Sequence, residues 1–242
     1  AKLFINRYIR NKYITPADEK GNQQLKIASL DFRPIPKCIA GTHLLTQIIT
    51  DKFVDHLPLY RQLQRFSREG VDIPSSTVDS WVRLVSQLLR PLYECHREHT
   101  LKNGYLQVDE SPIKVQDTDK KGATHQGYFW AYYDTVQRLI VFEYQKGRAA
   151  VFPKEVLKDY SGYLLTDGYE GYSQFDAMPN ITTHNCWVHA RRKFYDAQTF
   201  HKEKCEAVLT LIAKLYAVER EFKEDSPEHR QEARQSTAIP IL

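Results

Sequence analysis

Cysteine and methionine are scarce in this sequence, which has four Cys and one Met among 242 residues. The cysteines lack the short paired spacing of a zinc site and are too few for a disulfide framework; they are Cys38, Cys95, Cys186 and Cys205. A zinc module and a disulfide-stabilised secreted domain are therefore excluded, and a reducing cytoplasm fits this composition best.

Long apolar runs and a strong excess of one charge are also missing. No stretch approaches the ~18 residues of a bilayer-spanning helix, no signal-peptide pattern opens the chain, and the mean hydropathy is −0.54. We therefore expect a soluble protein with no membrane partner. Lys and Arg number 34 against 30 Asp and Glu, and this net charge of +4 permits nucleic acid as a partner without requiring it.

The first hundred residues combine an extended arm with a helical module. Residues 1–40 alternate weakly in hydrophobicity and are predicted to form an arm, whereas the apolar spacing in 41–100 fits three helices. Within 57–89, the residues after Gly70 resemble the turn of a helix-turn-helix, with Ser76 and Arg83 on the outer face of its second helix. A helical hairpin that only packs is the alternative, and both interpretations stay open.

Strand patterns begin after residue 100. Apolar and aromatic runs at 105–108, 128–133 and 139–144 predict three strands, followed by a helix at 149–158, a strand at 162–166, a short helix at 170–175, a strand at 181–184 and a helix from Trp187. This order favours an α/β fold with a ribonuclease-H-like mixed sheet flanked by helices over 101–204. An amphipathic helix then runs from Cys205 to about Lys223, with a charged helical continuation to Ser236.

Two aspartates, Asp109 and Asp167, each directly follow an apolar strand run. If those strands are parallel neighbours, both carboxylates emerge at one edge of the sheet, where they can share a pair of Mg²⁺ or Mn²⁺ ions. The alternative is that each Asp only starts a turn, and both interpretations stay open. Glu110 is expected to point to the opposite side of the strand from Asp109 and to have a supporting role at most.

The segment from Trp187 predicts a basic helix. His189, Arg191, Arg192 and Lys193 form overlapping faces on which phosphates could bind, with Trp187 in a supporting position. A solvated charged surface with an ordinary buried histidine is the alternative.

Several motifs, taken together and in this order, resemble the central region of bacterial transposases of the insertion-sequence-66 family. They are RPIPK (33–37), DHLPLYRQ (55–62), GV (70–71), STVDSWV (76–82), VDES (108–111), LTDGYEGY (165–172), CWVHARRKF (186–194) and LIAKLYAVE (211–219).

This resemblance implies a bacterial DDE transposase, in which two aspartates and a glutamate bind two divalent metals for strand cleavage and transfer of an insertion sequence. By motif position Asp109 and Asp167 are the first two acids. The resemblance also implies DNA partners, namely element ends and target, a homo-oligomer on DNA, and a nucleoid-associated location in the cytoplasm.

The family's third acid follows an Asn-Asn pair, and no Asn-Asn occurs in this sequence. The family's upstream cysteine-rich stretch is also missing, and the chain opens at Ala1 rather than Met. We therefore expect a central fragment of a longer transposase, with 205–242 as the start of an insertion before the third acid. The alternatives are a catalytically inactive DNA-binding remnant and a nuclease on the same fold.

Overall fold

The computed structural model describes residues 3–29, 33–117, 120 and 122–242. The chain divides into two compact units, Ala1–Glu94 and Cys95–Leu242. Parts of the expected N-terminal arm, residues 1–2 and 30–32, lie outside the described residues.

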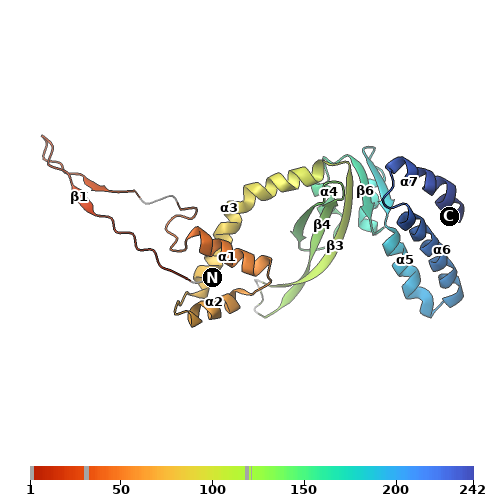
Figure 1. The fold of residues 1–242 in the computed structure, drawn as a ribbon, viewed down its shortest axis with the longest axis horizontal. Helices are drawn as coiled ribbons and strands as arrows, with labels where there is room; N and C mark the ends of the chain where they lie inside the picture. The colour runs from red at the N-terminus through yellow and green to blue at the C-terminus, as the bar shows by residue number, and fades with distance from the viewer. Residues whose placement is uncertain (1–2, 30–32, 118–119, 121) are drawn as a thin grey trace. The chain divides into compact units, whose positions relative to one another are not determined.

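The N-terminal unit contains a β-hairpin and three helices (Figure 1). Strands β1 (Lys12–Ile14) and β2 (Leu25–Ile27) are antiparallel, and helices α1 (Thr42–Phe53), α2 (Leu59–Arg68) and α3 (Ser75–Lys102) follow, the last continuing into the second unit. Gly70 has a φ of +81°, a left-handed conformation that ends α2. The three expected helices are therefore present.

A small apolar core holds these helices together. It comprises Ile35, Cys38, Ala40, Leu45, Ile48, Phe66, Val78 and Trp81. Gln62 is fully buried beside this core, and its amide donates to the carbonyls of Ile48 (3.2 Å) and Leu57 (3.1 Å). Because a buried amide without partners would destabilise the fold, these bonds fix how α2 lies against α1.

The C-terminal unit is a mixed α/β fold with a five-stranded sheet in the order β5-β4-β3-β6-β7. Its strands are β3 (Tyr105–Gln116), β4 (Thr124–Asp134), β5 (Leu139–Gln145), β6 (Gly162–Thr166) and β7 (Ile181–Asn185). The pairs β3–β4 and β4–β5 are antiparallel, while β3–β6 and β6–β7 are parallel. The expected order of strands and helices is confirmed.

Helices flank this sheet. They are α4 (Val151–Val156), η1 (Glu170–Phe175), α5 (Trp187–Asp196), η2 (Ala197–Thr199), α6 (Lys202–Glu221), α7 (Pro227–Ala233), η3 (Arg234–Ala238) and η4 (Ile239–Ile241). In Figure 1, α5, α6 and α7 (blue) gather on the side of β6 and β7. The main core comprises Leu106, Val108, Trp130, Tyr132, Leu157, Tyr160, Leu164, Tyr172, Phe175 and Ile181.

Two expectations about element ends are wrong. Strand β3 does not stop at Val108 but continues through Asp109 to Gln116, because its polar second half pairs with β4 along its whole length. The helix after Cys205 does not continue to Ser236 but ends at Glu221. A new helix starts at Pro227, where Ser226 caps it by accepting from the His229 N–H at 3.3 Å.

None of the helices in the described part of the chain combines the length and the apolar composition that a bilayer-spanning segment needs.

Candidate metal centre

The parallel pairing of β3 with β6 brings Asp109 and Asp167 to the same level of the sheet. Tyr105 pairs with Tyr163 and Gln107 with Leu165, an offset of 58 residues that also separates the two aspartates. The described pairing ends at Gln107 and Leu165, so both aspartates lie two residues beyond its last pair. Asp109 is thus inside a strand on its β4 side but past the end of pairing on its β6 side.

Glu110 joins these two aspartates. One carboxylate oxygen of each of Asp109, Glu110 and Asp167 lies within 4.8 Å of the others. Along β3, Glu110 is buried like Val108 while Asp109 is exposed, which agrees with the expected opposite faces, yet the Glu110 carboxylate still lies near the two aspartates. Strand β4 pairs with β3 at both positions, but the described pairing with β6 has ended, and the carboxylates of Asp109, Glu110 and Asp167 come together on that unpaired side.

Burial and hydrogen bonding hold Glu110 in one position. The Tyr172 hydroxyl donates to Glu110 Oε2 at 2.6 Å, and Arg148 Nε donates to Oε1. Burial raises the pKa of the Glu110 carboxyl, and the bonds from Tyr172 and Arg148 oppose this rise without cancelling it. Burial, followed by the bond to Glu110, raises the pKa of the Tyr172 hydroxyl well above its usual value, so this group remains a hydrogen-bond donor.

Arg148 bridges two of the three acids. Besides its bond to Glu110, its Nη2 donates to Asp167 Oδ2 at 3.2 Å, and the guanidinium lies 3.9 Å from the centre of the Tyr169 ring. Burial acts to lower the pKa of Arg148, but the bond and charge of Glu110 outweigh it and the pKa is raised, so Arg148 remains positively charged. Arg148 precedes α4 in a segment with no motif to mark it, so the sequence did not predict its place at the site.

Helix α5 begins beside the acids. The Cys186 N–H donates to the Thr166 carbonyl at 2.8 Å, which anchors the start of α5 at the end of β6. His189 Nε2 lies 3.8 Å from Asp109 Oδ2, and its Nδ1 is buried without a hydrogen-bond partner among the described residues. His189 was expected on a phosphate-binding face, and the structure places it against Asp109.

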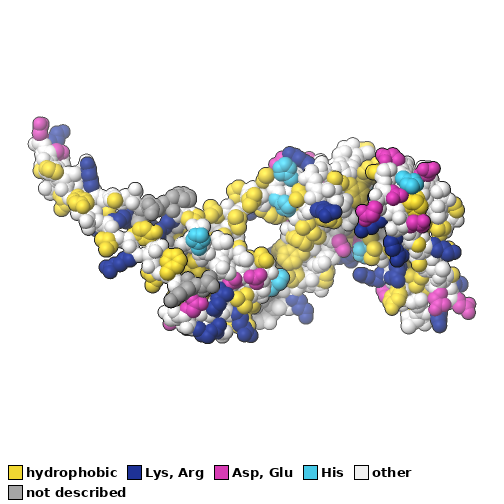
Figure 2. Space-filling model, in the orientation of Figure 1, with side chains coloured by type: hydrophobic (Ala, Val, Ile, Leu, Met, Phe, Trp, Pro, Cys, Tyr) yellow, Lys and Arg dark blue, Asp and Glu magenta, His cyan; other side chains and the backbone are white. Residues whose placement is uncertain are grey.

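The basic residues of α5 are accessible. Arg191, Arg192 and Lys193 are exposed, and Trp187 is also exposed at the first turn. Figure 2 shows Lys and Arg side chains (dark blue) gathered around the position of α5. The guanidinium of Arg191 lies 5.8 Å from the centre of the Tyr195 ring one turn later.

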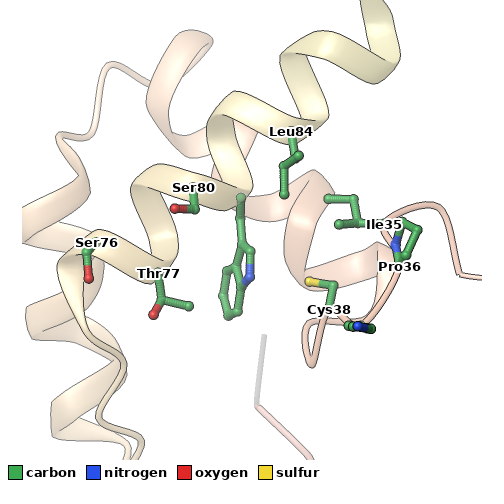
Figure 3. Close-up of a pocket in the computed structure, with 9 residues that line it drawn as sticks. Ile35, Pro36, Cys38, Ser76, Thr77, Ser80 and Leu84 are labelled. Carbon is green, nitrogen blue, oxygen red and sulfur yellow. The ribbon is translucent and has the colours of Figure 1, made fainter.

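Ser76 and Arg83 are exposed on α3 in the N-terminal unit, as expected. Ser76 also borders a shallow groove of about 340 Å³, lined by Ile35, Pro36, Lys37, Cys38, Ser76, Thr77, Ser80, Trp81 and Leu84. In Figure 3, Ser76, Thr77 and Ser80 project from α3, and Ile35, Pro36 and Cys38 lie on the other side of the groove.

The acidic cluster, which consists of Asp109, Glu110 and Asp167, suits a hard cation. Three carboxylates in close proximity repel one another, and oxygen ligands of this kind are those that Mg²⁺ and Mn²⁺ accept. In the described part of the chain, no glutamate of α6 belongs to this cluster. Glu219 of α6 is instead bonded to Arg234 at 2.6 and 2.7 Å.

Comparison with known proteins identifies the family. A profile of the transposase IS66 family matches residues 37–242, which is most of the chain. The chain belongs to the transposase IS66 family.

Similar proteins include three from Sinorhizobium fredii (strain NBRC 101917 / NGR234). The chain is 29% identical to uncharacterized protein y4jD over its whole length and 49% of that protein. It is 29% identical to uncharacterized protein y4hP over 87% of its length and 42% of that protein, and 28% identical to uncharacterized protein y4qI over 82% and 40%. The chain thus spans about half the length, or less, of the curated relatives it matches.

Family membership agrees with the motif resemblance. The region that matches the IS66 transposase family includes Asp109, Glu110, Asp167 and the whole of α5. The acidic cluster and the basic helix are therefore both parts of the family region of the chain.

Proposed function

We propose that this chain forms the metal-binding core of a DDE-type DNA transposase. The observation that carries the proposal is the register of β3 and β6, which brings Asp109 and Asp167 together beyond the end of the parallel pair. A sheet with an antiparallel hairpin on one side and parallel strands on the other is also typical of ribonuclease-H-like folds.

Each acid has a distinct setting in this proposal. Asp109 is the exposed ligand, with more than half of its side chain accessible, and faces the substrate. Asp167 is more enclosed, and its Oδ1 accepts from the Tyr169 N–H at 2.8 Å, which orients the carboxylate. Glu110 supports them from the buried side. A bound pair of Mg²⁺ or Mn²⁺ ions supplies activation of the attacking oxygen and stabilisation of the leaving oxygen.

DNA is the proposed substrate, held by phosphate contacts. The helix that starts at the acidic cluster exposes Arg191, Arg192 and Lys193. A DNA backbone bound to these residues would therefore lie near Asp109. Ser76 and Arg83 of the helical module are proposed as further DNA contacts. We expect the protein to act as a homo-oligomer that holds the element ends and the target.

The third catalytic acid is proposed to come from the Asn-Asn-x-x-Glu-Arg setting of the family, which these 242 residues do not contain. Glu219 of α6 is a poor substitute, since it is bonded to Arg234 and also lies 3.6 Å from Arg230. Loss of an interaction worth ~4 kcal/mol costs roughly a thousandfold in rate. We therefore expect residues 1–242 alone to bind metal and DNA with strand joining near background.

The test is nicking and strand joining on element-end DNA with Mn²⁺. It compares residues 1–242 with a longer protein that includes the glutamate of the Asn-Asn-x-x-Glu-Arg setting. Each protein is tested as wild type, as Asp109→Asn and as Asp167→Asn. Joining by the extended protein that falls about a thousandfold in either variant, with DNA binding retained, supports the proposal.

Other outcomes separate the alternatives. Nicking without joining identifies a nuclease, and DNA binding without either reaction identifies an inactive remnant. Strand joining that survives both substitutions contradicts the proposed site. If residues 1–242 join strands as fast as the extended protein does, the third acid does not come from the downstream Asn-Asn-x-x-Glu-Arg setting.

A further inference from the structure

Arg148 bonds to two of the three acids of the candidate metal centre. Its Nε and Nη2 donate to Glu110 and Asp167, so two separate donors of one guanidinium point at two acids of the cluster. Together with Asp109, these two acids bring ligand oxygens within 4.8 Å of one another. A carboxylate lone pair that accepts from an N–H is not available to a cation at the same time. A cation bound to these acids would also be repelled by the positive charge of the Arg148 guanidinium.

The guanidinium also has an aromatic contact besides its bonds to the acids. It stacks 3.9 Å from the centre of the Tyr169 ring, and the Tyr169 hydroxyl donates to the Arg148 carbonyl at 3.1 Å. With about two-fifths of its side chain accessible, Arg148 is not enclosed. It can therefore give up its two carboxylate bonds and keep its aromatic contact.

Tyr172 provides the complementary support for Glu110. Its hydroxyl bonds to Glu110 Oε2, the oxygen that Arg148 does not contact. Glu110 thus keeps one hydrogen bond and its position when the guanidinium leaves.

We propose that Arg148 is a tethered counter-ion, which holds Glu110 and Asp167 together while no metal is bound and competes with the divalent cation for their oxygens. This inference rests on the metal site of the proposed function and adds that this positioning residue sets the metal concentration at which the site fills. If Arg148 only held the acids in place, its loss would make the carboxylates of Glu110 and Asp167 more mobile and would weaken metal binding. A competing counter-ion has the opposite effect, because its loss strengthens metal binding.

The test measures Mn²⁺ affinity by titration calorimetry for the wild-type chain and for Arg148→Gln. We expect Arg148→Gln to bind Mn²⁺ about tenfold more tightly, since removing one nearby positive charge favours a second one. The matched control is Arg97→Gln. Arg97 bonds to Glu143 at 2.6 Å, and Glu143 lies in the same row of the sheet as Glu110, two strands away. This control removes an equal charge and a similar ion pair, and its Mn²⁺ affinity should change less than twofold.

Arg148→Lys covers the case in which Arg148→Gln does not fold. A lysine keeps the charge but lacks the planar fork that reaches two acids, so its Mn²⁺ affinity should rise at least twofold. An unchanged or weaker affinity in the folded Arg148 variants, with a wild-type chain that binds Mn²⁺, overturns the role of Arg148 alone. Absence of Mn²⁺ binding in the wild type and both variants overturns the metal site as well. Binding by the variants but not by the wild type supports the inference.

Discussion

His189 lies against Asp109, with its Nε2 3.8 Å from the carboxylate Oδ2. This contact joins α5 to the acidic cluster within one compact unit. Arg192 and Lys193 are exposed and lie three and four residues after His189, so a phosphate bound to them would lie near the carboxylates.

Divalent metal should stabilise the folded chain. At a Mn²⁺ concentration one hundred times its Kd, binding adds about 2.7 kcal/mol, which corresponds to roughly 5–10 °C in Tm. The double variant Asp109→Asn/Asp167→Asn should lose this shift, whereas Asp159→Asn, which removes an exposed acid from the same unit, should keep it. Thermal unfolding with Mn²⁺ and with a chelator measures the effect, and an equal shift in all three proteins would contradict the metal site.

The basic residues of α5 should contribute affinity for DNA without sequence preference. Replacing Arg191, Arg192 and Lys193 with alanine should weaken binding to every duplex alike. The negative slope of log K for DNA binding against log salt concentration should become shallower by about 2–3. The control replaces Lys154, Lys158 and Lys204, three exposed lysines elsewhere in the unit, and so removes the same charge. Fluorescence anisotropy over a series of salt concentrations gives both slopes. Identical slopes for the two triple variants would show that α5 is only a solvated surface.

Gln62 should stabilise the helical module through its two buried bonds to backbone carbonyls. Gln62→Leu leaves the carbonyls of Ile48 and Leu57 without this donor, and we expect the free energy of unfolding to fall by about 1–3 kcal/mol. Gln64→Leu changes an exposed position of the same helix and should stay within about 0.5 kcal/mol of wild type. Urea denaturation compares them, and equal midpoints would refute the role of Gln62.

Tyr160 should make the C-terminal unit sensitive to alkaline pH. Burial raises the pKa of its hydroxyl from 10.0 to about 12, and the hydroxyl donates to the Tyr163 carbonyl at 2.7 Å. Since folding favours the neutral form, this contribution is complete below pH 10 and is lost as the pH rises to about 12.

In Tyr160→Phe, the free energy of unfolding should be about 1 kcal/mol lower than wild type near pH 8, where the hydrogen bond is lost. As the pH rises from 10 to 12, wild type should lose up to about 2 kcal/mol relative to Tyr160→Phe, so this difference should shrink to zero and then change sign. Tyr195→Phe, at an exposed position of α5, should follow the wild-type curve. Denaturation at pH 8 and pH 11 measures the change, and parallel curves for wild type and Tyr160→Phe would contradict it.

The sequence by itself determined the order of the elements. Hydrophobic periodicity marks the three helices of the N-terminal unit and the strands of the sheet, because a buried face repeats with the geometry of its element. The separation of Asp109 and Asp167 was also present in the sequence, but its meaning depended on the register of two strands that are 58 residues apart.

Only the tertiary structure decided the contents of the acidic cluster. The Glu110 carboxylate lies close to those of Asp109 and Asp167 on the side of β3 where pairing with β6 has ended, and alternation along β3 could not show this proximity. Arg148 reaches Glu110 and Asp167 from the segment before α4, and no local pattern marks it. Local patterns record which face of an element is buried, whereas contacts between distant side chains follow from how the elements pack. For that reason the proximity of Asp109 and Asp167 could be predicted from the sequence, and the contacts of Arg148 could not.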